Sequence, residues 1–133
     1  MSTSTDQEIE RGRAHFQKTL GNLPDPIRAM MKHTPEVFAG YLKFREGIYH
    51  DGGTGHLDLK TKEMLYTMLD IVTHNQDGAE NHGAAAFRAG MTSTELAEAC
   101  MIAMHVCGVT VWGRTGWKVV DFIAGLEADA KKA

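Results

Sequence analysis

The hydrophobic positions along this chain recur with the spacing of α-helices, and we find no segment with the strict alternation of a β-strand. Clusters of turn-forming residues separate the helical segments, and no proline occurs after Pro35, which favours long unbroken helices. We find no repeat of fixed period. The pattern therefore predicts an all-α protein, a compact helical bundle formed by one domain that spans residues 1–133.

The predicted helices cover most of the chain. The segment 50–56, His-Asp-Gly-Gly-Thr-Gly-His, is the longest cluster of helix breakers and is predicted to be a loop. Pro26 suits the first position of a short helix. The predicted helical segments are 6–20, 27–32, 35–49, a pair between 63 and 90 that is broken at 75–78, 92–107 and about 111–132.

The helix that begins near Glu63 is amphipathic. Its polar residues Glu63, Thr67, Asp70 and His74 recur at steps of four, three and four, which places them on one face. The opposite face is apolar and carries Met64, Leu65, Met68, Leu69 and Val72. The segment 63–90, which this helix opens, contains most of the candidate functional residues.

The second helix of this pair is rich in alanine. Asp77 is predicted to be its N-cap, with Glu80 three residues later in the capping-box position. His82 then lies in the first or second turn, near the positive end of the helix. Gly90 is placed to end the helix in a left-handed conformation.

A second capping box, Thr92-x-x-Glu95, opens the helix that is predicted to reach Cys107. Its buried stripe is predicted to contain Leu96, Cys100, Ala103 and Cys107, so both thiols should be buried and inert. The two cysteines are seven residues apart, about 10 Å along a helix, which is too far for a disulfide. Two unpaired thiols fit a cytoplasmic protein.

Composition excludes some classes of partner. The chain has 133 residues, an apolar fraction of 43% and a formal net charge of -3, so it has no basic field for nucleic acid. No apolar run is long enough to cross a bilayer, and the polar, acidic N-terminus does not have the pattern of a signal peptide.

Three motifs resemble the carboxymuconolactone decarboxylase superfamily, which includes the alkylhydroperoxidase D-type peroxidases. They are 57–63 (Leu-Asp-Leu-Lys-Thr-Lys-Glu), His82-x-x-Ala-Ala-x-x-Ala-Gly90 and Thr92-x-x-Glu95-Leu96-x-Glu98, and the resemblance covers about 57–108. The peroxidase branch carries Cys-x-x-Cys-x-x-x-His, but here Asn75 and Gly78 stand at the two cysteine positions. Without a thiolate there is no nucleophile for peroxide.

The resemblance implies a fold, an assembly and an activity. The fold is a helical bundle of the alkylhydroperoxidase D-like type, and the assembly is a homo-oligomer, a trimer or a dimer of trimers. For the decarboxylase branch the resemblance implies loss of CO2 from an unsaturated lactone acid, with no cofactor. The partner is then a small acidic substrate.

His82 and Glu63 are the predicted catalytic pair. The resemblance places both at family positions, and a neutral imidazole near a helix N-terminus can give or take a proton. From the residues alone, His82 could equally be a packing histidine and Glu63 a solvated surface glutamate. We expect no metal site, because no His-x-x-x-His or Glu-x-x-His pair is present.

The other candidate residues would bind the substrate. His74 and Asn75 stand at the helix break and could line a pocket, and Glu80 could do so too if it does not serve as a cap. Arg114 is the candidate anchor for a carboxylate, and His105 lies on a face opposite the buried stripe. Both could also be ordinary surface charges.

Three functions stay open at this stage. The first is a decarboxylase-like enzyme that works by proton transfer, although an isomerase or a hydratase would use the same residues. The second is a residual thiol peroxidase that uses Cys100 or Cys107. The third is a non-catalytic binding or assembly protein.

Overall fold

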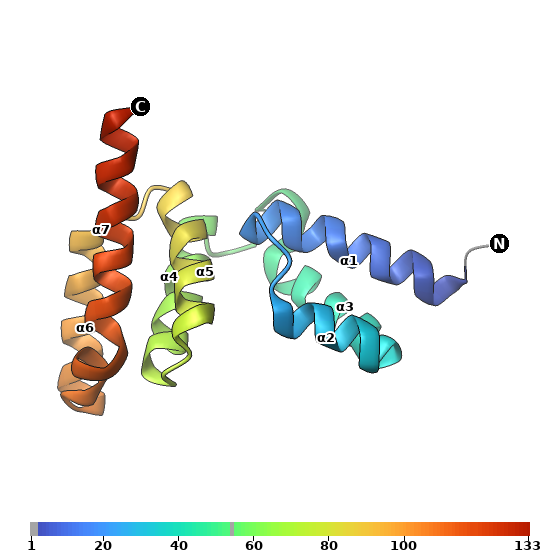
Figure 1. Cartoon of the computed structure of the whole chain (residues 1–133), viewed down its shortest axis with the longest axis horizontal. Helices are drawn as coiled ribbons and strands as arrows, with labels where there is room; N and C mark the ends of the chain where they lie inside the picture. The colour runs from blue at the N-terminus through green and yellow to red at the C-terminus, as the bar shows by residue number, and fades with distance from the viewer. Residues whose placement is uncertain (1–2, 54) are drawn as a thin grey trace. The chain divides into compact units, whose positions relative to one another are not determined.

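The computed structural model describes residues 3–53 and 55–133, and every element in this part of the chain is a helix. The all-α prediction is therefore confirmed. The chain divides into two compact units, Met1–His56 and Leu57–Ala133; a single domain stays a prediction. The helices (Figure 1) are α1 Ser4–Leu20, α2 Asp25–His33, α3 Pro35–Gly53, α4 Leu59–Val72, α5 Gln76–Arg88, α6 Ser93–Cys107, the π-helix η1 Val111–Gly116 and α7 Trp117–Lys132.

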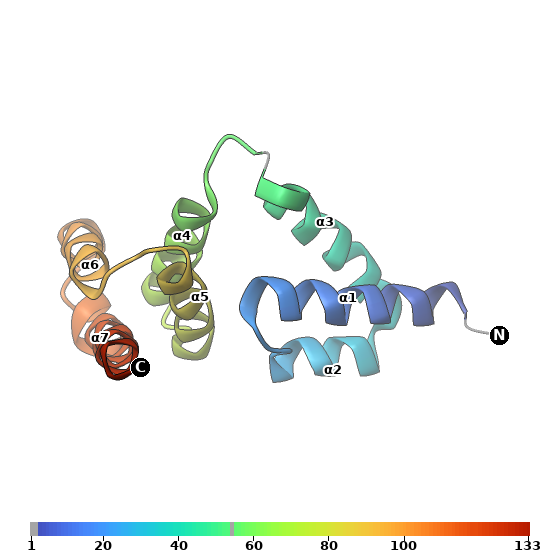
Figure 2. The same ribbon diagram turned by 90° about the horizontal axis from the view of Figure 1, so that it is seen from above.

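In the first unit, α3 packs against both α1 and α2 (Figure 2). One cation, Arg45, is buried in it: its guanidinium lies over the rings of Phe16 and Tyr49 at 4.3 and 4.5 Å and donates a hydrogen bond to Thr19 Oγ1 at 2.8 Å. The hydrophobic core around it contains Phe16, Leu20, Ile27, Met31, Phe38, Leu42 and Tyr49. These hydrogen bonds and aromatic contacts offset the free-energy cost of removing the Arg45 guanidinium from water.

The end of α3 differs from the prediction. A loop was expected over 50–56, but the helix continues to Gly53. Residue 54 lies outside the described residues. A glycine inside a helix costs only about 1 kcal/mol relative to alanine, so Gly52 and Gly53 weaken the last turn without preventing it.

In the second unit, α4, α5, α6 and α7 run up and down alternately (Figure 1). α5 packs against α4 and α7, and α6 packs against α4, η1 and α7. The Thr92–Glu95 capping box is present as predicted. The core between these helices contains Ile71, Ala79, Ala86, Met91, Leu96, Cys100, Val111, Val119 and Ile123.

The polar face of α4 points into this unit. Glu63 and Thr67 are fully buried. On the predicted apolar face, Leu65 and Leu69 are 49% and 64% exposed, whereas Met64, Met68 and Val72 are partly buried against the core. An amphipathic helix normally buries its apolar face. Here the small residues of α5 allow the polar stripe to approach closely: Gly83 lies against the Thr67 methyl group, so an added Cβ would be 3.6 Å away.

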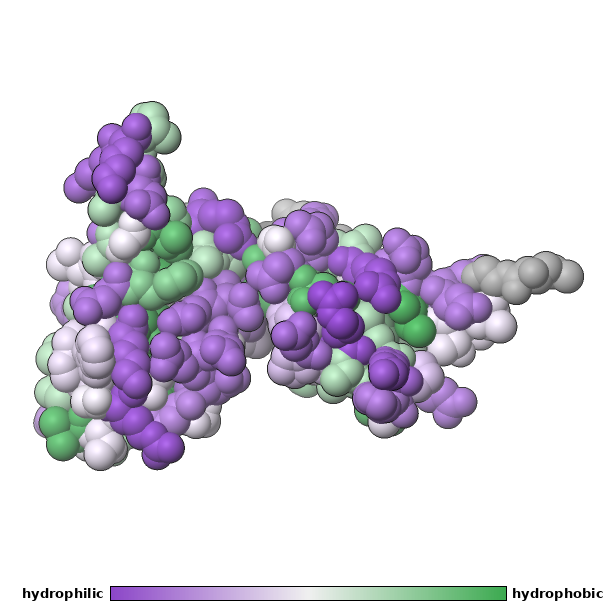
Figure 3. Space-filling view, in the orientation of Figure 1, coloured by the Kyte–Doolittle hydropathy of each residue, from purple (hydrophilic) through white to green (hydrophobic). Residues whose placement is uncertain are grey.

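Several large apolar side chains of the second unit lie at its surface, and Figure 3 shows such hydrophobic areas among hydrophilic ones. On and after α6 they are Ile102, Val106 and Val109, which are 67%, 78% and 70% exposed. The prediction that Cys107 is buried is wrong, because Cys107 is the last residue of α6 and lies beyond the core that covers Cys100. Among the described residues no helix is both long and apolar enough to span a bilayer.

Candidate functional site

The junction between α4 and α5 is a tight turn that is built around Asn75. His74 has a φ of 60°, in the left-handed region, which reverses the chain directly after α4. Asn75 is the N-cap of α5, and its Oδ1 accepts a hydrogen bond from the Gly78 backbone amide at 3.3 Å. An asparagine suits both tasks of this turn.

The predicted cap at Asp77 is wrong. Because α5 begins at Gln76, Asp77 already lies in its first turn, where its charge complements the helix dipole. Glu80 therefore does not complete a capping box; it accepts a hydrogen bond from Gln76 Nε2 at 3.1 Å instead. Asn75 and Asp77, two residues apart, are both of capping type, so the sequence does not distinguish them.

Glu63 and His82 meet between α4 and α5. Glu63 Oε2 lies 2.7 Å from His82 Nδ1, the glutamate is fully buried, and the histidine side chain is 12% exposed. The ring of Tyr66 stacks on the imidazole with a centroid distance of 4.2 Å and an interplanar angle of 7°. The imidazole is thus fixed at its edge by a carboxylate and on one face by an aromatic ring.

This contact determines which nitrogen of His82 can react. An ionised Glu63 can only accept a hydrogen bond, so the hydrogen of this bond resides on Nδ1. Nε2 is then the nitrogen that exchanges a proton with another group. Among residues 3–53 and 55–133, the side-chain hydrogen bond of this imidazole is the one between Nδ1 and Glu63.

A second carboxylate, Asp70, lies close to this pair. Asn75 Nδ2 donates a hydrogen bond to Asp70 Oδ1 at 3.1 Å. Burial raises the pKa of the Asp70 carboxyl, and the charge of His82 and the bond from Asn75 oppose that rise. The site therefore places one imidazole under the influence of two carboxylates of different burial.

Lys62 precedes Glu63 and is buried, with 8% of its surface exposed. Its Nζ is shielded from solvent and has no hydrogen-bond partner among the described residues. A buried ammonium group normally needs a compensating partner, because its desolvation is costly. A ligand carboxylate is one partner that would satisfy it.

The remaining predicted residues are more scattered. His74 Nδ1 lies 3.0 Å from Thr115 Oγ1, which connects the α4–α5 turn to η1. His105 on α6 and Arg114 on η1 are exposed. In the same part of the chain, no three His, Cys, Asp or Glu side chains gather to hold a metal ion.

Sequence reasoning missed the contributions of Lys62 and Tyr66, and it treated Asp70 only as part of a polar face. A usable signal existed, because Lys62, Tyr66 and Asp70 follow one another at steps of four. Such a stripe lies next to the Glu63–Thr67 stripe on the same helix. Lys62 and Tyr66 were passed over because each is common on a solvated face.

The two thiols lie outside this site, on α6. Burial raises the pKa of the Cys100 thiol to about 11, so Cys100 is a neutral thiol near neutral pH. Cys107 is exposed at the end of the same helix. Since a thiolate is the nucleophile in peroxide chemistry, Cys100 is a poor candidate for that role.

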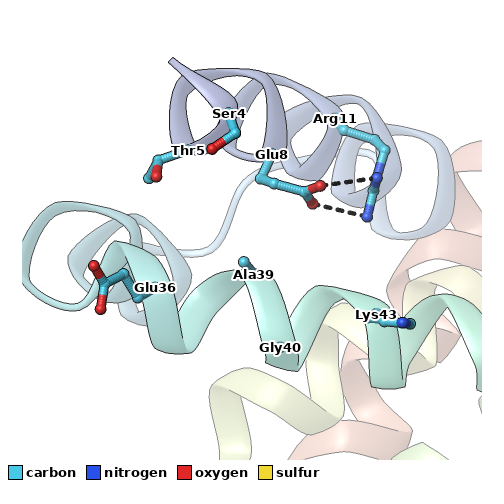
Figure 4. A pocket seen from close by; sticks show the side chains of 8 residues that line it. All are labelled: Ser4, Thr5, Glu8, Arg11, Glu36, Ala39, Gly40 and Lys43. Atoms are coloured by element: carbon cyan, nitrogen blue, oxygen red, sulfur yellow. Dashed lines mark hydrogen bonds and ion pairs between the residues drawn. The ribbon is translucent and has the colours of Figure 1, made fainter.

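A groove in the first unit lies between α1 and α3 (Figure 4). Within it, Arg11 pairs with Glu8 at 2.8 Å, and it also contacts Glu46 at 3.1 Å. The residues that line it are Ser4, Thr5, Glu8, Arg11, Glu36, Ala39, Gly40 and Lys43. The groove lacks a buried acid–base group and offers no chemistry comparable to that of His82.

Comparison with known proteins agrees with this picture. A crystal structure of a proposed carboxymuconolactone decarboxylase from Burkholderia xenovorans LB400 superposes with a TM-score of 0.90 at 29% identity, over 98% of this chain and 99% of that chain. Among curated proteins no sequence matches. The profile of the Carboxymuconolactone decarboxylase family matches residues 35–119, which include the whole Glu63–His82 site. The chain belongs to the carboxymuconolactone decarboxylase family.

Proposed function

We propose that this protein is a cofactor-independent enzyme that acts by proton transfer on a small unsaturated carboxylic acid of the lactone type. The observation that carries the proposal is the 2.7 Å contact between the fully buried Glu63 and Nδ1 of His82. A carboxylate that orients an imidazole at one nitrogen leaves the other nitrogen to act as acid or base.

The reaction that this pair would serve is a decarboxylation. The bond to the carboxylate carbon breaks, CO2 leaves, and the electron pair enters the conjugated lactone. His82, protonated on both ring nitrogens, then gives its Nε2 proton to the far carbon, while Glu63 stabilises the imidazolium. An isomerisation would use the same proton transfers without loss of CO2, so the release of CO2 distinguishes the two reactions.

The substrate carboxylate needs a cation. Arg114 is one candidate, because a guanidinium can hold a carboxylate with two hydrogen bonds. Lys62 is the stronger candidate, because its buried Nζ has no hydrogen-bond partner among the described residues. It also lies four residues before Tyr66, which stacks on His82, and so shares that face of α4. A bound carboxylate would neutralise this ammonium group and complete its hydrogen bonding.

A homo-oligomer, a trimer or a hexamer, forms part of the same proposal, as does a cytoplasmic location. The exposed side chains of Ile102 and Val106 support an assembly, because large exposed apolar side chains on a helix commonly mark a contact surface. The α6 surface would then be covered by another copy of the chain.

The test begins with a screen of muconolactone-type acids, followed by ultraviolet absorbance and by CO2 release. With a substrate in hand, His82→Gln and Glu63→Gln should each lower turnover by about 10² to 10⁴-fold. The double variant should lose little more than either single variant, because members of one catalytic unit fail together.

His33→Gln is the matched control, since His33 is exposed on α2. Its turnover should equal that of the wild type. If His82→Gln turns over a confirmed substrate at the wild-type rate, His82 is not the acid–base group.

A further inference from the structure

Decarboxylation consumes one proton per turnover, which raises the question of how His82 is reloaded. This step rests on the proposed function, since a site that only isomerises its substrate would recover its proton internally. Glu63 is fully buried and already engages Nδ1, so it cannot carry protons in from solvent. Another group near His82 has to connect the imidazole with water.

Asp70 is placed for this task. It lies on α4 seven residues after Glu63, on the same side of the helix, and it is only partly buried. Its Oδ1 accepts a hydrogen bond from Asn75, which is exposed at the start of α5. The carboxylate therefore has one side toward the protein interior and another toward the solvated turn.

Gly78 leaves the space that Asp70 occupies. A Cβ at residue 78 would lie 2.7 Å from Asp70 Oδ2 and would clash more severely with Asn75 Nδ2. Because Gly78 and His82 are four residues apart on α5, they share one face, and the His82 side chain leans toward the turn that contains Gly78. The Asp70 carboxylate thus lies beside the turn of α5 toward which the His82 side chain leans.

Electrostatics support the same arrangement. Burial raises the pKa of the Asp70 carboxyl, so Asp70 holds a proton at a higher pH than an ordinary aspartate does. The positive charge of His82 lowers the pKa of the Asp70 carboxyl and so opposes this rise. The other titratable groups on α4, on the turn and on η1 include Glu63, Tyr66, His74 and Arg114.

We propose that Asp70 is the proton-relay residue of this site: it takes a proton from solvent at the α4–α5 turn and passes it, through a bridging water molecule, to Nε2 of His82 after each turnover. Asp70 acts through His82 and does not touch the substrate. Asn75 and Gly78 are positioning residues that hold its carboxylate in place.

The first experiment needs no substrate. The carbon-13 signal of the Asp70 carboxyl is followed by NMR during a pH titration of the wild type and of His82→Gln. In the wild type we expect a midpoint above the ordinary range for aspartate. In His82→Gln the midpoint should move to higher pH, because the positive charge that lowers the pKa of Asp70 is lost.

The second experiment measures kcat as a function of pH for Asp70→Asn, with Asp77→Asn as the matched control on the exposed start of α5. Asp70→Asn should lower kcat by about tenfold or more, less than the loss expected for His82→Gln, and leave KM close to the wild-type value. The acidic limb of its pH profile should also change, which a merely structural role would not produce.

Gly78→Ala provides a variant that keeps the carboxylate but displaces it. We expect a loss of kcat similar to that of Asp70→Asn. The fold should be retained, because the two closest atoms that the new methyl group would displace are ends of the Asn75 and Asp70 side chains and not backbone.

The outcomes separate this inference from the proposed function. An Asp70 midpoint that does not respond to His82→Gln, or a kcat of Asp70→Asn equal to that of Asp77→Asn, would overturn the relay and leave the acid–base role of His82 intact. If instead His82→Gln is fully active while the Asp70 midpoint shifts as expected, the proposed function fails and the electrostatic coupling stands.

Discussion

Glu63 Oε2 lies 2.7 Å from His82 Nδ1, although 19 residues separate the two in sequence and a left-handed residue, His74, lies between them. The contact exists because α4 and α5 pack antiparallel through a turn of only three residues, 73–75. A buried carboxylate costs free energy of folding because it loses its hydration, and the contact with the imidazole offsets part of that cost.

The stability of the fold should therefore depend on how this pair is broken. His82→Ala removes the 2.7 Å contact with Nδ1 from a fully buried carboxylate and should lower the free energy of unfolding by roughly 3 to 5 kcal/mol. Glu63→Gln keeps a hydrogen-bonding group at the same place and should cost much less. Urea denaturation of both variants measures the difference; equal and small losses would show that the contact carries little energy.

Lys62 should matter for binding and not for folding. Lys62→Met removes a buried ammonium group that has no hydrogen-bond partner among the described residues, so the free energy of unfolding should stay the same or rise. If Lys62 holds the substrate carboxylate, KM for the lactone acid should rise by about tenfold or more, which corresponds to 1.4 kcal/mol or more of lost binding.

Lys60→Gln is the control for Lys62, because Lys60 lies two residues earlier and pairs with Glu95 at the surface at 2.9 Å. Its KM should not change. A Lys62→Met variant with an unchanged KM and a much lower stability would instead assign Lys62 to the fold.

The two thiols should differ in reactivity. Near neutral pH, Cys107 should react readily with a maleimide because it is exposed, whereas Cys100 should stay unmodified until the protein unfolds. The raised pKa of Cys100, about 11, keeps it a thiol, so its reaction in the folded protein should begin only as pH approaches that value. Mass spectrometry after labelling counts the adducts, and rapid modification of Cys100 at neutral pH would show that its surroundings open.

The α6 surface should control the oligomeric state. Light scattering after size exclusion should give a mass several times the 14.6 kDa of one chain. Ile102→Lys and Val106→Lys should lower that mass, because each places a charge in an apolar contact. Asp121→Lys, at an exposed polar position of α7, is the control. A monomeric wild type at micromolar concentration would contradict the proposed assembly.

Sequence patterns located the helices more reliably than they assigned burial. The steps between Glu63, Thr67 and Asp70 correctly placed these residues on one face, because helical periodicity is a local property. Which face is buried depends on the neighbour that packs against it. Here the neighbour is α5 with Gly83, and a sequence pattern for α4 alone holds no information about α5.

The errors at element ends have a similar origin. Asn75 and Asp77 are both good capping residues, and the choice between them depends on the left-handed conformation of His74, which is set by tertiary structure. Cys107 continues the stripe of Leu96 and Cys100, but the core ends before the helix does. Periodicity cannot report where the packing partner stops.

The inward polar face of α4 implies a stability–activity trade-off. The seam between α4 and α5 contains Glu63, Thr67 and His82 where an ordinary helix pair would have leucines, so it contributes less hydrophobic free energy than its close packing would allow. Well-packed apolar replacements at Glu63 and His82 together should raise the thermal stability and abolish proton transfer. A selection for heat resistance alone would therefore act against the polar side chains between α4 and α5 before it changed the fold.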